Sequence, residues 1–151
     1  MFHKLKLSHV LRSPSNKDLI TLLRNWDNDY VARENERIKK TGEIFTPTEL
    51  VNQMLDNLES TNCSLFVDKE KTVIDPCCGN GQFLSEVLIR KLQNNISLED
   101  ALSTIYGIDI MLDNIDICRE RLLCGQEQYR HIVERNIVCG DALTFNYDIW
   151  D

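Results

Sequence analysis

One segment in the middle of the chain constrains the fold more than any other. A short β-type run, Thr72 to Ile74, leads into the loop 75–81, DPCCGNG, and a helical pattern of apolar residues follows. Gly79 and Gly81 lack a Cβ, so the backbone can approach a ligand closely and adopt conformations closed to other residues. The unsatisfied N–H groups of the helix start behind the loop favour an anionic group. This strand–loop–helix unit predicts an α/β fold in which the loop is either a ligand site or an ordinary strand-to-helix turn.

Two further strands are predicted, and they alternate with helices. The strands cover 105–109 and 136–139, and the helices follow the loop at 83–92, 98–104 and 111–126. Ser97 is the expected cap of the helix at 98–104, and residues 59–71 are expected to form a polar loop. This alternation favours parallel pairing with right-handed crossovers, hence a doubly wound α/β sheet. Because only three strands can be counted, we expect an open sheet edge whose N–H and C=O groups seek a partner strand.

An N-terminal helical segment, 1–40, is predicted to precede the sheet domain, 41–151. Its helix follows the turn 13–16 and ends near Gly42, with one buried face formed by Leu19, Leu22, Leu23, Trp26 and Tyr30. A second helix begins at TPTE, where Thr46 is the expected cap and Pro47 the first helical residue. Its predicted apolar face consists of Leu50, Val51, Met54, Leu55 and Leu58.

Composition excludes several classes of protein. No apolar run reaches the length of a membrane span, and the N-terminus does not resemble a signal peptide, so a cytoplasmic protein is expected. The six cysteines form no Cys-x-x-Cys pair and have no histidine at ligand spacing, which favours reduced packing residues over disulfides or a metal site. The net charge of −7 disfavours nucleic-acid binding by the chain alone, although residues 1–40 carry +4. Those basic residues either contact phosphates or form a solvated helix face.

Acidic residues follow the second and third predicted strands. Asp109 can accept hydrogen bonds from both hydroxyls of a ribose, and Asp141 can accept from an exocyclic amine. Each acid could instead cap the turn that follows it. A third acid, Asp75, follows the first predicted strand. Because parallel strands end at the same edge, the glycine loop and these three carboxylates should converge on one crevice. Such a crevice suits a nucleoside with a cationic tail. The glycine patterns typical of NAD and ATP sites are absent.

Four segments resemble adenine-N6 DNA methyltransferases, in particular type I modification subunits and fused type II enzymes. DPCCGNGQFL at 75–84 is similar to the family's DPxCGSGxFL motif, and TGEIFTP at 41–47 is similar to the segment that precedes it. YGIDI at 106–110 and CGDAL at 139–143 resemble the next two motifs, in the same order. The resemblance implies S-adenosylmethionine as cofactor and part of a class I, Rossmann-like methyltransferase sheet.

The resemblance also implies a role for individual residues. The methionine side of the cofactor would contact Phe45, Thr46 and Pro47. The floor of the site would consist of Asp75, Cys77, Gly79 and Gly81. Asp109 would hold the ribose with Ile110 against the adenine face, and Asp141 would receive the adenine amine with Ala142 beside it. Two departures from the family pattern are mild: Cys77 replaces a small residue such as Ala, and Asn80 replaces Ser.

A third departure concerns catalysis. The family transfers its methyl group with an Asn/Asp-Pro-Pro-Tyr/Phe tetrapeptide that holds the flipped base. The three prolines here, Pro14, Pro47 and Pro76, are not adjacent, so no catalytic residue is assigned. The chain is therefore expected to be the cofactor-binding portion of a truncated or split restriction-modification methyltransferase. It would be inactive alone, and would reach DNA through the complete enzyme or a partner chain.

Two alternatives compete with this interpretation. A non-catalytic, methyltransferase-like binding or regulatory protein that pairs with another chain predicts the same motifs, so the sequence does not separate it from the first. A methyltransferase acting on protein glutamine is disfavoured by the Phe-Thr-Pro segment at 45–47. Homodimerisation or association with a complementary subunit is expected in either of the first two cases.

Overall fold

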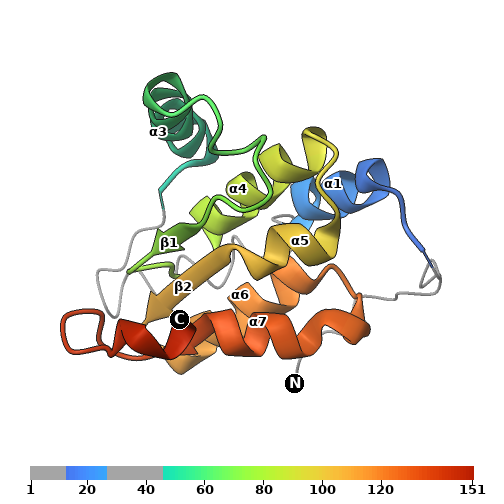
Figure 1. Ribbon diagram of the computed structural model, residues 1–151. Helices are drawn as coiled ribbons and strands as arrows, with labels where there is room; N and C mark the ends of the chain where they lie inside the picture. Colours follow the sequence, from blue (N-terminus) through green and yellow to red (C-terminus); the bar gives the residue numbers. More distant parts are fainter. Residues whose placement is uncertain (1–12, 27–45) are drawn as a thin grey trace.

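The computed structural model describes residues 13–26 and 46–151 (Figure 1). Its sheet has three parallel strands in the order β1 (Val73–Asp75), β2 (Ile105–Asp109) and β3 (Ile137–Cys139). The helices are α1 (Asn16–Arg24), α3 (Thr48–Thr61), α4 (Gln82–Gln93), α5 (Leu98–Ser103), α6 (Leu112–Leu123) and α7 (Arg130–Asn136), with 3-10 helices η2 (Glu127–Tyr129) and η3 (Tyr147–Trp150). The α/β class and the parallel pairing predicted from the sequence are confirmed.

The helix α4 lies at the centre of the molecule. It follows β1, packs against β2 and α6, and carries α1 and α3 on its other sides (Figure 1). Leu84 and Leu88 of α4 are fully buried, as is Ile105 of β2. The approach of α4 to the sheet is so close at Gly107 that a Cβ there would lie 2.7 Å from Cδ1 of Leu84. One face of β2 is therefore sealed by α4.

The C-terminal segment covers the other face of β2. Side chains alternate along a strand, so Tyr106 points away from the face that Gly107 presents to α4. The ring of Trp150 lies against Tyr106 with centroids 4.9 Å apart. Its Nε1 donates a 2.9 Å hydrogen bond to the carbonyl of Arg135 at the end of α7. Phe145 and Tyr147 pack on the same indole ring.

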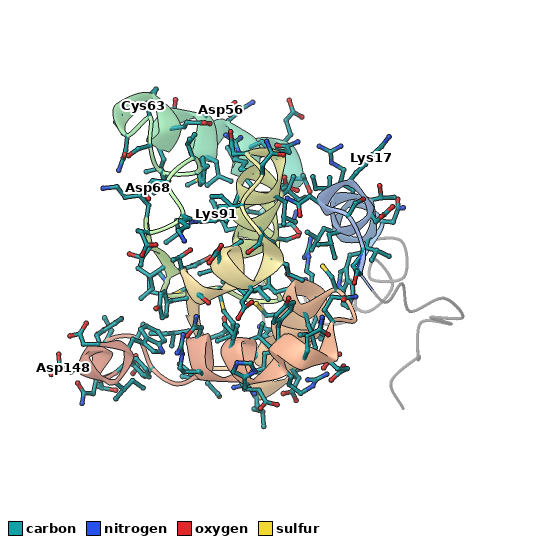
Figure 2. All side chains as sticks on the ribbon, turned by 45° about the vertical axis from the view of Figure 1, so that its right-hand side comes forward. Lys17, Asp56, Cys63, Asp68, Lys91 and Asp148 are labelled. Atoms are coloured by element: carbon teal, nitrogen blue, oxygen red, sulfur yellow. The ribbon has the colours of Figure 1, made fainter. Side chains whose placement is uncertain are left out.

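A buried lysine connects the starts of β1 and β2. Lys91 of α4, labelled in Figure 2, is fully buried, and its side chain reaches the start of β1. Its Nζ donates to the carbonyl of Lys71, at 2.7 Å, and to Oγ1 of Thr104, at 3.0 Å. These residues precede β1 and β2 respectively. Burial lowers the pKa of Lys91, and the nearby charge of Asp68 partly opposes that shift.

Several local predictions are confirmed and others are wrong. Ser97 caps α5 by accepting from the backbone N–H of Asp100, as predicted. The predicted cap at Thr46 is wrong: Pro47 is the N-cap because its ψ of 142° is extended, and α3 begins at Thr48. The helix α7 was not predicted, and it occupies the residues directly before β3. The segment predicted as a polar loop from residue 59 begins inside α3, which continues to Thr61.

The apolar faces of the two N-terminal helices are narrower than predicted. Val51 and Leu55 of α3 are buried, as are Leu19 and Leu23 of α1. Of the other predicted members, Trp26 is half-buried, and Leu22, Leu50, Met54 and Leu58 are exposed. Each helix packs with one stripe on α4, so the flanking apolar residues face solvent. Tyr30, Gly42 and the predicted boundary at residues 40 and 41 lie outside the described residues.

In the part of the chain that the structure describes, both β1 and β3 pair with β2 alone. Ile74, the central residue of β1, is 45% exposed. Among the described residues β1 and β3 are therefore both edge strands, as expected from the strand count. No helix among residues 13–26 and 46–151 has the length and apolar character needed to traverse a bilayer.

Candidate functional site

The loop between β1 and α4 depends on its two glycines. Gly79 has a φ of 52° and Gly81 a φ of 90°, in the left-handed region that side chains disfavour. The N–H of Gly81 donates to the carbonyl of Cys78 at 2.8 Å, and the N–H of Cys78 donates to Ile108 of β2 at 2.9 Å. A Cβ on Gly81 would lie 2.8 Å from Sγ of Cys118 on α6. The loop is thus folded tightly against β2 and α6.

Asp109, the last residue of β2, joins this loop to the next connection. Its Oδ2 accepts from the N–H of Gly79 at 2.9 Å. Its Oδ1 accepts from the N–H of Met111 at 2.8 Å and from Nδ2 of Asn114 at 3.3 Å. A carboxylate offers about four acceptor positions, so Oδ2 retains capacity for a further donor such as a ligand hydroxyl.

A second carboxylate, Asp75, lies at the end of β1. Burial raises its pKa, and so does the charge of Asp109. The N–H of Cys77 donates to Oδ1 of Asp75 at 3.1 Å and partly opposes the shift. Two neighbouring carboxylates at one sheet edge produce a negative potential there, which favours a cationic ligand.

The end of β3 is tied to the same edge. The N–H of Gly140 donates to the carbonyl of Asp109 at 2.9 Å. Asp141 follows directly and is exposed, and its Oδ1 accepts from the N–H of Leu143 at 2.9 Å. The turn-capping role considered for Asp141 is therefore present. The three strand ends thus converge.

The cysteines divide into two groups. Cys78, Cys118 and Cys124 are buried, whereas Cys63, Cys77 and Cys139 are exposed, so the predicted packing role is wrong for the second group. A hydrogen bond with Cys118, and then burial, raise the pKa of Cys78. Burial raises the pKa of Cys124 to about 12. The thiols of Cys78 and Cys124 are therefore protonated at neutral pH, and all three buried cysteines are small packing groups.

Comparison with known proteins decides the family. The sequence profile described as N-6 DNA Methylase matches residues 29–149. This chain belongs to the N-6 adenine DNA methyltransferase family. It is 36% identical over 112 residues to the type II methyltransferase M.VspI of Vibrio sp. (strain 343), which covers 73% of this chain and 22% of the relative.

A second relative supports the same family. An uncharacterized adenine-specific methylase of Mycoplasma pneumoniae is 31% identical over 88 residues, covering 58% of this chain and 18% of that protein. The chain therefore spans about a fifth of the length of these relatives. No solved structure matches it.

Most of the site residues predicted from the sequence lie around the loop between β1 and α4. Hydrogen bonds connect Gly79 with Asp109, and Asp109 with the start of the turn that contains Asp141. Ile110 is 71% exposed beside them, and the carbonyl of Ala142 accepts from Tyr147. Thr46 and Pro47 precede α3, whose Thr48 accepts a hydrogen bond from Gln82 at the start of α4. Phe45 lies outside the described residues.

Sequence reasoning missed three residues of this region. Asn114 holds Asp109 from the first turn of α6, and Cys118 packs against Gly81. Asn80 is buried between the two glycines. No sequence pattern indicates the first two. The contact of Asn114 with Asp109 depends on how α6 is turned, and the contact of Cys118 with Gly81 joins segments far apart in the chain. Asn80 was visible as a departure from the family motif.

Proposed function

We propose that this chain is the S-adenosylmethionine-binding portion of a restriction-modification DNA adenine-N6 methyltransferase, built on part of a class I, Rossmann-like sheet. The hydrogen bond from Gly79 to Asp109 carries the proposal, because it brings the glycine loop and the strand-end carboxylate into one site. The parallel order β1-β2-β3 supports it, since ligands of open α/β sheets bind at the carboxyl ends of the strands.

The residues present fit this cofactor. The free acceptor capacity of Asp109 suits the ribose hydroxyls, and exposed Ile110 suits the adenine face. Asp141 and Ala142 would flank the adenine amine. The paired carboxylates Asp75 and Asp109 favour a cationic sulfonium over an anionic ligand.

The remaining assignments concern the other end of the cofactor. Gly79 and Gly81 would form the floor with Asp75 and Cys77, and their lack of a Cβ allows close approach. Phe45, Thr46 and Pro47 would flank the methionine side. When bound, the cofactor supplies an electrophilic methyl group, and the role of these residues is to bind and orient it.

We also propose that these 151 residues alone do not methylate DNA. They contain no pair of adjacent prolines, so the family's base-holding tetrapeptide is not among them. The open edge of β1 would accept a strand from a second copy or a complementary subunit, and DNA would be reached through that assembly or the complete enzyme in the cytoplasm. Transfer of a tritiated methyl group to adenine by the purified chain would contradict this.

Isothermal titration calorimetry tests the cofactor proposal. Wild-type protein should bind S-adenosylmethionine and S-adenosylhomocysteine. Asp109→Ala should weaken binding by about 1.5 to 3 kcal/mol, the range for a hydrogen bond to a charged group. Asp116→Ala is the matched control, because this α6 carboxylate is half-exposed and paired only loosely with Arg119, at 3.9 Å. Equal affinity of the wild type and Asp109→Ala would show that the ribose is held elsewhere.

A further inference from the structure

The carboxylate of Asp109 already accepts several hydrogen bonds from the protein itself. Among residues 13–26 and 46–151, three groups donate to it. Oδ2 accepts from the N–H of Gly79 at 2.9 Å, and Oδ1 accepts from the N–H of Met111 at 2.8 Å and from Nδ2 of Asn114 at 3.3 Å. A carboxylate has about four acceptor positions, which are shared equally between its two oxygens. Both positions of Oδ1 are therefore filled, and one remains on Oδ2.

The donor from Asn114 differs from the other two because it depends on a side chain. Any residue except proline presents a backbone N–H at positions 79 and 111, whereas Nδ2 is there because residue 114 is asparagine. Asn114 lies in the first turn of α6 and is fully buried, and the N-cap of that helix, Met111, makes no side-chain hydrogen bond. Asparagine is a weak helix former, and a buried amide costs free energy unless it is hydrogen-bonded. A polar side chain at this position therefore indicates a specific role for the amide.

The two oxygens of Asp109 face different parts of the molecule. Oδ1 lies against the fully buried Asn114, so it is turned toward α6. Oδ2 lies against Gly79, so it is turned toward the loop between β1 and α4. Asp109 itself is only half-buried. A ligand bound at this loop would therefore meet the carboxylate at Oδ2.

We propose that Asn114 is a positioning residue that restricts Asp109 to one hydrogen bond with the ribose of the cofactor, at Oδ2. The inference rests on the proposed function and deepens it, because it assigns the oxygen that binds and limits how many hydroxyls it holds. The sequence alone allows Asp109 to accept from both hydroxyls of the ribose. With Oδ1 filled by Met111 and Asn114, one hydroxyl is held and the other gains no bond from this carboxylate.

Calorimetry with wild-type protein tests the number of hydroxyls held. The ligands are S-adenosylhomocysteine and its 2′-deoxy and 3′-deoxy forms, each of which lacks one ribose hydroxyl. One deoxy form should bind roughly 10- to 100-fold more weakly than the parent, the range for a hydrogen bond to a charged group. The other should bind within about threefold of the parent. A similar large loss for both deoxy forms would overturn the inference.

Variants of Asn114 test its part in this selectivity. Asn114→Leu keeps roughly the volume of the side chain and removes the donor, and Asn114→Ala also leaves space beside the carboxylate. In both, Oδ1 regains an acceptor position, and rotation about χ2 of Asp109 can turn the group toward both hydroxyls. The affinities for the two deoxy forms should then differ by less than about threefold. Asp109→Ala should abolish the difference as well.

A neighbouring residue provides the control for structural effects. Ile115→Val shortens the next side chain of α6, which is also fully buried. It should lower the melting temperature, as the Asn114 variants should, because each removes a buried contact. The difference between the two deoxy forms should stay as in the wild type. Loss of that difference in Ile115→Val would overturn the specific role of Asn114.

The outcomes separate the inference from the proposed function. If wild-type protein binds none of the three ligands, the proposed function fails and the inference fails with it. If the wild type binds them but loses affinity equally for both deoxy forms, only the inference is overturned. Full selectivity in the Asn114 variants, or in Asp109→Ala, also overturns it, because the hydroxyls are then distinguished elsewhere. The wild-type comparison decides the first point even where a variant does not fold.

Discussion

The backbone N–H of Gly79 donates a 2.9 Å hydrogen bond to Oδ2 of Asp109, which joins the loop after β1 to the end of β2. The other carboxylate oxygen binds the N–H of Met111, where the connection to α6 begins. One side chain therefore fixes both walls of the candidate site before any ligand is present. Such preorganisation reduces the entropy that ligand binding must otherwise cost.

This double role predicts that Asp109→Asn destabilises the free protein. The carboxylate oxygens of Asp109 accept from the N–H groups of Gly79 and Met111. In the variant, the NH2 group of the amide replaces one of these oxygens, so one of the two backbone donors loses its partner. The free energy of unfolding in urea should fall by about 1 to 3 kcal/mol. Asp116→Asn, on the surface of α6, should change it by less than about 0.5 kcal/mol. Equal stability of the two variants would contradict a structural role for Asp109.

Gly81 should tolerate no side chain. Its φ of 90° and the 2.8 Å approach to Sγ of Cys118 are independent obstacles to a Cβ. The left-handed conformation costs about 1 to 2 kcal/mol and overpacking about 1 to 3 kcal/mol, so Gly81→Ala should lose about 2 to 5 kcal/mol of stability.

A double-mutant cycle separates these two contributions. Cys118→Ala removes the thiol that the new Cβ would meet, so the double variant should lose less stability than the sum of the single variants. Strict additivity in urea denaturation would assign the whole effect to the backbone conformation of Gly81.

Gly107 and Gly140 form a matched pair for testing the packing of β2. A Cβ on Gly107 would lie 2.7 Å from Leu84 and 3.0 Å from Sγ of Cys78, whereas one on Gly140 would meet Phe145 at an ordinary 3.6 Å. Gly107→Ala should therefore lower the free energy of unfolding by about 1 to 3 kcal/mol. Gly140→Ala should be neutral or stabilise by up to about 1 kcal/mol, since it restricts the unfolded chain. The reverse order in thermal denaturation would refute the proximity of α4 to β2.

The sequence allowed the strands to be located because each ends in a chemically distinctive residue. The strand predicted at 105–109 matches β2, since an apolar run there ends at Asp109. Parallel pairing followed from the intervening helices. In contrast, α7 was missed because only Ile132 and Val133 are apolar within it, which is too few for a helical period to be recognised.

The contacts of the site were less predictable than its residues. Asp109 and Gly79 could be placed at one edge from topology, but not the bond between them, because side-chain direction depends on how α4 and α6 pack. The same limit applies to α3, where the period identified five apolar residues but could not reveal that only Val51 and Leu55 face α4. Propensity and periodicity report what a helix can bury, and the neighbouring elements determine what it does bury.

The carboxyl group of Asp75 predicts a dependence of stability on pH. Burial, and then the charge of Asp109, raise its pKa above the ordinary value of 3.8, so the folded protein binds this proton more tightly than the unfolded chain does. Its stabilising contribution is therefore complete below pH 3.8 and is lost as the pH rises through the folded-state pKa. Asp75→Asn removes the ionisation and keeps an oxygen that can accept from the N–H of Cys77.

Asp75→Asn should therefore be more stable than the wild type at pH 7, and the difference should shrink as the pH falls toward 4. Urea denaturation of both proteins between pH 4 and pH 7.5 measures this difference directly. Asp148→Asn changes an exposed carboxylate near the C-terminus and should follow the wild-type curve. A constant difference between Asp75→Asn and the wild type would mean that the variant acts through packing or hydrogen bonding. In that case, the negative potential at the sheet edge would not be what destabilises the ionised Asp75 in the folded protein.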